Sequence, residues 1–112
     1  MQYTLHKRTT EFTTNLINQL KIIKLSPYNK NIVDQLIRSG SSVGANYREA
    51  CGTATRKDFV SKIALCKKEA LETVYWLEIL QNTDSLPNLK LLLVEAKELT
   101  LIFAQSLITA RH

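Results

Sequence analysis

The sequence has no long apolar run and few residues of the types that build metal or redox sites. Its longest apolar stretches, such as residues 91–94, are far too short to span a membrane. The N-terminal segment lacks the apolar core and the small-residue cleavage site of a signal peptide. We therefore expect a cytoplasmic protein that has no membrane partner.

Histidine and cysteine are scarce, with two residues of each. His6 and His112 lie near the two ends of the chain, so a four-ligand zinc site is not expected, and nothing indicates another metal or a cofactor. Cys51 and Cys66 have no C-x-x-C partner. A disulfide and two reduced, half-buried thiols both fit this spacing, and the compartment favours reduced thiols.

The remaining composition is that of a basic globular domain. The 112 residues are 45% hydrophobic, which is enough for one domain with its own core over residues 1–112. Fifteen Lys and Arg residues against ten Asp and Glu residues give a net charge of +5. This balance is compatible with an RNA, DNA or other polyanionic partner, although many basic domains bind no nucleic acid.

Apolar residues recur at helical spacing along four segments. We expect helices at about residues 10–24, from residue 28 or 29 to 51, from the cap at Thr55 to about 82, and beyond a cap at Asp84 or Ser85, with Pro87 in the first turn. No segment is typical of a strand. Short connections between long helices favour antiparallel neighbours, so the predicted fold is all-α, an up-down-up-down four-helix bundle.

Small residues dominate residues 35–50, QLIRSGSSVGANYREA. Glycine inside a helix costs about 0.5–1 kcal/mol relative to alanine, so Gly40 and Gly44 indicate either a kink or the close approach of another helix.

An antiparallel hairpin around residues 52–55 would bring polar residues of the second and third predicted helices together. Its register places Arg38 near Glu69 and Glu72, and Glu49 near Lys62. We interpret these groups as a structural polar network rather than as paired catalytic carboxylates, because no histidine falls in a predicted helix. The network comprises Arg38, Asn46, Glu49, Glu69 and Glu72. No nucleophile–histidine set, Walker loop or dinucleotide fingerprint occurs, so we expect no enzyme.

Basic residues gather around the same turn and along the third predicted helix. The candidate phosphate contacts are Arg48, Arg56, Lys57, Lys62, Lys67 and Lys68. A helix start beside them would add a favourable dipole for an anion. The alternative is a solvated face with pairs such as Asp58–Lys62 and Lys68–Glu72 four residues apart.

The fourth predicted helix carries more apolar residues than one core face can use, including Leu91, Val94, Leu101 and Ile108. A helix that is apolar on most sides is buried on more than one side, which favours a homo-oligomer. Scattered exposed leucines are the alternative.

The chain resembles the four-helix-bundle family named after proteins encoded in intervening sequences of bacterial 23S ribosomal RNA. The resemblance rests on residues 35–46, QLIRSGSSVGAN, followed by Glu49-Ala50, KDF at 57–59, Lys62, KEA at 68–70, Glu72 and YWL at 75–77. It implies an up-down bundle assembled into a ring, with a homopentamer favoured. The family also resembles the accessory subunit of diversity-generating retroelements, which binds nucleic acid and partners a reverse transcriptase.

These observations favour a non-enzymatic oligomer that binds RNA or DNA through basic faces. The alternative is a protein-interaction scaffold, or an accessory subunit for a nucleic-acid enzyme such as a reverse transcriptase. In that case the apolar fourth helix and Tyr3, Tyr28 or Tyr75 would matter more than the lysines.

Overall fold

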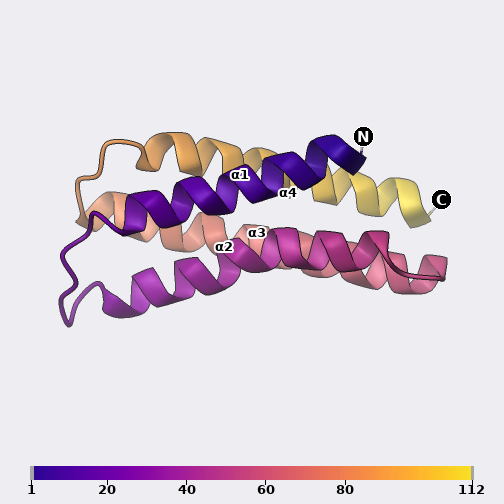
Figure 1. Ribbon diagram of the computed structural model, residues 1–112, viewed down its shortest axis with the longest axis horizontal. Helices are drawn as coiled ribbons and strands as arrows, with labels where there is room; N and C mark the ends of the chain where they lie inside the picture. The colour runs from indigo at the N-terminus through magenta and orange to yellow at the C-terminus, as the bar shows by residue number, and fades with distance from the viewer. Residues whose placement is uncertain (1, 112) are drawn as a thin grey trace.

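The computed structural model describes residues 2–111 and contains four α-helices with no strand among these residues. They are α1 (Gln2–Leu20), α2 (Lys30–Cys51), α3 (Arg56–Thr83) and α4 (Leu89–Arg111). Successive helices run in opposite directions along a bundle measuring 44 × 23 × 20 Å (Figure 1). The beginning of α1, the α2–α3 turn and the end of α4 lie at the same end of the bundle. The predicted all-α class and up-down-up-down order are confirmed.

Each helix turns one apolar stripe into a shared core, as its sequence period requires. Each helix packs against two neighbours, and α2–α3 and α3–α4 are the closest pairs. The largest fully buried hydrophobic side chains come from all four helices: Leu16, Leu36, Val43, Ile63, Leu77, Leu80, Leu89, Leu99 and Phe103.

The small residues of α2 let α1 approach closely. A methyl group at Gly40 would overlap the Leu16 side chain, and one at Gly44 would lie 3.1 Å from Thr9. The two glycines therefore serve helix packing, which is one of the two roles that the sequence indicated. In addition, Thr13 donates a hydrogen bond of 3.2 Å to the Gly40 carbonyl.

The first helix begins and ends earlier than its predicted range of 10–24. Leu5 and the buried Thr9 extend the core stripe toward the N-terminus. His6 lies within α1, and its ring contacts that of Tyr47 in a tilted arrangement with 4.9 Å between ring centroids, so the expectation that no helix holds a histidine is wrong. At the other end, the Ile22 and Ile23 amides bond to carbonyls three residues earlier, which tightens the chain into a turn well before Pro27.

The predicted start of the last helix is also wrong. Asp84 closes α3, because its amide donates to the Leu80 carbonyl at 2.8 Å, and α4 begins only at Leu89. Pro87 lies in the turn before the helix. The intervening segment brings Leu86 against the core, a tertiary contact that capping preferences alone do not reveal.

Candidate nucleic-acid interface

A short turn joins α2 to α3 and fixes where the candidate cations lie. The Gly52 amide donates to the Glu49 carbonyl at the end of α2, and the Thr55 hydroxyl accepts from the Asp58 amide at 3.1 Å. The predicted Thr55 cap is therefore present. The turn thus joins the end of α2, which carries Arg48, to the start of α3, which carries Arg56 and Lys57.

Arg38 connects α2 to α3 through two carboxylates. Its Nη1 pairs with Glu69 Oε1 at 3.0 Å, its Nη2 pairs with Glu72 Oε2, and its Nε donates to Gln35. The Trp76 indole N–H also donates to Glu72 at 3.1 Å. The Arg38 hydrogen bond is the largest cause that lowers the pKa of Glu72, and the Trp76 bond acts in the same direction. These contacts fix the register of α2 against α3.

The other two members of the predicted polar network differ from each other. Glu49 of α2 forms an ion pair with Lys62 of α3, with 2.6 Å between Oε1 and Nζ. Lys62 is therefore paired with the neighbouring helix rather than with Asp58 of its own helix. The Asn46 amide instead donates to the Ser42 carbonyl of its own helix at 2.9 Å. No contact joins Asn46 to the carboxylates among the described residues.

The six candidate phosphate contacts do not share one face. Arg48 reaches toward α1 and donates to Thr10 at 3.2 Å, whereas Arg56 reaches toward α4 and donates to the Ala110 carbonyl at 2.6 Å. Lys62 faces α2. The remaining three have no ion pair with any residue that the structure describes, and Lys57 and Lys68 are exposed while Lys67 is half-buried.

Lys57 and Lys68 lie on the same outward side of α3. Their separation of eleven residues corresponds to three helical turns, about 16 Å. The small residues Ser61, which is exposed, and Ala64, which is half-buried, lie between them on this side. The same periodicity continues to Tyr75, which is 53% exposed. We call Lys57, Ser61, Ala64, Lys68 and Tyr75 the outer α3 face.

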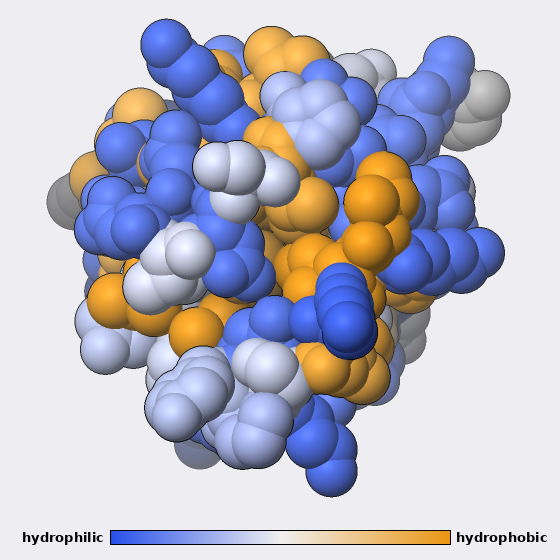
Figure 2. All heavy atoms as spheres, turned by 90° about the vertical axis from the view of Figure 1, so that its left-hand side faces the viewer, coloured by the Kyte–Doolittle hydropathy of each residue, from blue (hydrophilic) through white to orange (hydrophobic). Residues whose placement is uncertain are grey.

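Sequence reasoning missed a second group of cations at the opposite end of the bundle. Lys21, Lys24, Lys30 and Lys90 are exposed there, around the exposed side chains of Ile22, Leu25 and Tyr28. Figure 2 views this end and shows apolar and hydrophilic side chains intermixed. The sequence could have revealed this group, because these lysines lie in or beside the two longer connections between helices, residues 21–29 and 84–88.

The cysteine of α3 faces the core, on the side of the helix opposite the outer α3 face, and is not an activated nucleophile. Burial raises the pKa of Cys66 to about 12, so its thiol stays protonated at neutral pH. Both cysteines are free. No cluster of ligating side chains within the described residues could hold a metal ion. None of the four described helices is long and apolar enough to cross a membrane.

Comparisons with known proteins identify a family and a solved structure that are similar to this chain. A crystal structure of a protein with unknown function from the S23 ribosomal protein family of Bacteroides thetaiotaomicron is similar, with a TM-score of 0.84 and 29% identity over 95% of this chain and 96% of that chain. The comparison with curated proteins gave no match. The family model described as 23S rRNA-intervening sequence protein matches residues 2–104, and the chain therefore belongs to this family.

Proposed function

We propose that this protein is a non-enzymatic homo-oligomer that binds RNA or DNA, with the outer α3 face as its main contact. The observation that carries the proposal is the pair of exposed lysines, Lys57 and Lys68, that have no ion-pair partner within the described residues. Cations without a close ion pair remain available to neutralise phosphates, which releases counterions from the nucleic-acid backbone.

Two further features support this face. The exposed Tyr75 ring offers a surface on which an unpaired base could stack, in line with the two lysines. The start of α3, at Arg56, adds the positive end of a helix dipole near Lys57. Contacts of this kind recognise backbone and stacked bases, so the binding would depend weakly on sequence.

The oligomeric part of the proposal rests on the outward side of α4. Val94, Leu101 and Ile108 recur every seven residues and are 50%, 70% and 54% exposed. Side chains at this spacing lie in one row along a helix and form a seam, in which Glu98 and Gln105 alternate with the apolar residues. A second copy of the chain would remove this seam from water, and a ring of copies would repeat the basic faces around the assembly.

The experiment compares two charge-reversal variants that change the net charge equally. Lys57→Glu/Lys68→Glu alters the outer α3 face, and Lys21→Glu/Lys24→Glu alters the opposite end of the bundle. Affinity for a fluorescent single-stranded RNA is measured at low salt, with circular dichroism to verify folding. We expect the first variant to lose at least tenfold more affinity than the second. Equal losses would show that only net charge matters, and unchanged binding by the first variant would refute the proposed face.

A further inference from the structure

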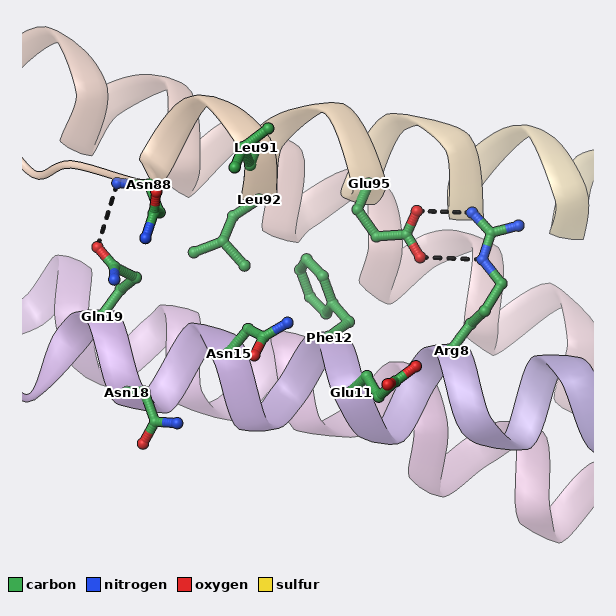
Figure 3. A pocket seen from close by; sticks show the side chains of 10 residues that line it. All are labelled: Arg8, Glu11, Phe12, Asn15, Asn18, Gln19, Asn88, Leu91, Leu92 and Glu95. Carbon is green, nitrogen blue, oxygen red and sulfur yellow. Dashed lines mark hydrogen bonds and ion pairs between the residues drawn. The ribbon is translucent and has the colours of Figure 1, made fainter.

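A slot lies between α1, from Arg8 to Gln19, and the first two turns of α4, up to Glu95. It has a volume of about 490 Å³ and is closed at both ends by polar bridges between the helices (Figure 3). At one end the Arg8 guanidinium makes two bonds to Glu95, of 2.6 and 3.0 Å. At the other end the Asn88 backbone amide donates to the Gln19 side chain at 3.3 Å.

The slot follows from how α1 is held. Because Gly40 and Gly44 have no side chains, α1 lies close against α2. It packs much more sparsely against α4 than against α2. The polar bridges then span the gap that the core side chains do not fill. The slot is therefore a consequence of the same glycines that define this segment of the sequence.

The walls combine an apolar floor with carboxamides. Phe12 from α1 and Leu92 from α4 form the floor, and Leu91, 69% exposed, stands on the rim. The side-chain amides of Asn15 and Asn88 lie on opposite walls (Figure 3) and have no hydrogen-bond partner among the residues that the structure describes. A carboxamide offers a donor and an acceptor side by side, which matches a peptide group.

The charge of the slot is opposite to that of the chain. Glu11 and Glu95 line it, and Glu98 lies 3.8 Å from Arg8, which is the one cation in the lining. Arg8 already pairs with Glu95 and Glu98, so Glu11 is the lining carboxylate left to disfavour a phosphate backbone and to attract a cationic group. The slot is thus unsuited to the ligand that the outer α3 face would bind.

We propose that this slot binds a short extended segment of a partner protein, in which an apolar side chain is followed or preceded by Lys or Arg. The apolar side chain would fill the space above Phe12 and Leu92, and the backbone would pair with Asn15 and Asn88. The cationic side chain would lie near Glu11. The two bridging residues of α1, Arg8 and Gln19, are eleven positions apart, a rise of about 16 Å, which is the length of four to five extended residues. This function goes beyond nucleic-acid binding and does not depend on it.

The test uses blocked tetrapeptides that contain one leucine next to one lysine, with glutamate in place of lysine as the matched probe. Binding is followed by the side-chain amide NMR signals of Asn15 and Asn88. We expect saturable shifts with the lysine peptides and at least tenfold weaker binding of the glutamate peptides. Leu91→Ser should weaken binding about tenfold, because it removes an apolar contact. Leu71→Ser, at an exposed leucine of α3 that lies outside the slot and outside the α4 seam, should have no effect.

Several outcomes would overturn the inference. These are the absence of shifts at millimolar peptide, equal loss in both leucine variants, or shifts of the same amides on addition of an RNA oligonucleotide. Shifts that depend on protein concentration without peptide would assign the slot to a second copy of the chain. The Lys57→Glu/Lys68→Glu variant should still bind the peptides, so failure of the nucleic-acid proposal can be recognised separately.

Discussion

Arg38 and Glu72 form an ion pair that links the middle of α2 to the middle of α3, and Trp76 donates a hydrogen bond to the same carboxylate. The side chain of Arg38 is 46% exposed and that of Glu72 is 31% exposed. Solvent screens such a pair, so it fixes the register of the two helices more than it stabilises the fold.

Replacement of Arg38 by alanine should lower the free energy of unfolding by about 1 kcal/mol at pH 7. Because the folded-state pKa of Glu72 is depressed, its contribution is present above the unfolded value near 4.5 and is lost as the pH falls through the folded pKa. The difference between wild type and Arg38→Ala should therefore shrink below pH 4.5 in urea titrations. Arg48→Ala, which removes an exposed arginine of the same helix, should show no such trend; a constant difference for Arg38→Ala would contradict the assignment.

A buried pair of hydroxyls gives a second prediction. Thr73 and Ser39 are fully buried, and their hydroxyl oxygens lie 2.9 Å apart between α3 and α2. Thr73→Val should cost about 1–3 kcal/mol, because it leaves the Ser39 hydroxyl without this partner. Adding Ser39→Ala should recover part of the loss, measured as a coupling energy in a double-mutant cycle. Strictly additive effects would show that the two hydroxyls do not interact.

Gly40 should be intolerant of alanine even though alanine favours a helix. The added methyl group overlaps the end of the buried Leu16 side chain, so that side chain or α1 must move, and we expect a loss of about 1–3 kcal/mol in urea unfolding. Gly52→Ala is the control, because the nearest atom would lie 3.6 Å away and its φ is −95°. A Gly40→Ala variant as stable as Gly52→Ala would mean that close packing of α1 is not required.

The sequence predicted the helices best where core contacts follow a regular period. Thr55 and the facing positions of Arg38 and Glu69 could be placed from local capping and hairpin register. The start of α1 could not, because Thr9, a polar residue, occupies a core position against Gly44. The start of α4 was misplaced for a related reason, since Leu86 packs against the core from within the loop.

The candidate site was harder to predict, because side-chain direction decides it. Arg48, Arg56 and Lys62 are close in sequence but contact three different helices. The α1–α4 slot left no local pattern, since its residues come from segments about seventy positions apart. It depends on the spacing of two helices rather than on a motif.

Nucleic-acid binding by the outer α3 face should depend steeply on salt. Each phosphate contact to a single strand contributes about 0.7 to the slope of log affinity against log salt concentration. Lys57→Glu/Lys68→Glu should therefore reduce the slope by about 1.4 for each protomer that contacts the strand. Fluorescence anisotropy at four salt concentrations measures both slopes, and parallel lines would exclude these lysines as phosphate contacts.

The most direct measurement is light scattering of the purified protein with and without a single-stranded RNA. We expect a mass that is a multiple of the 12.8 kDa protomer and that increases when RNA is added at low salt. A 12.8 kDa monomer whose mass does not change with RNA would contradict it.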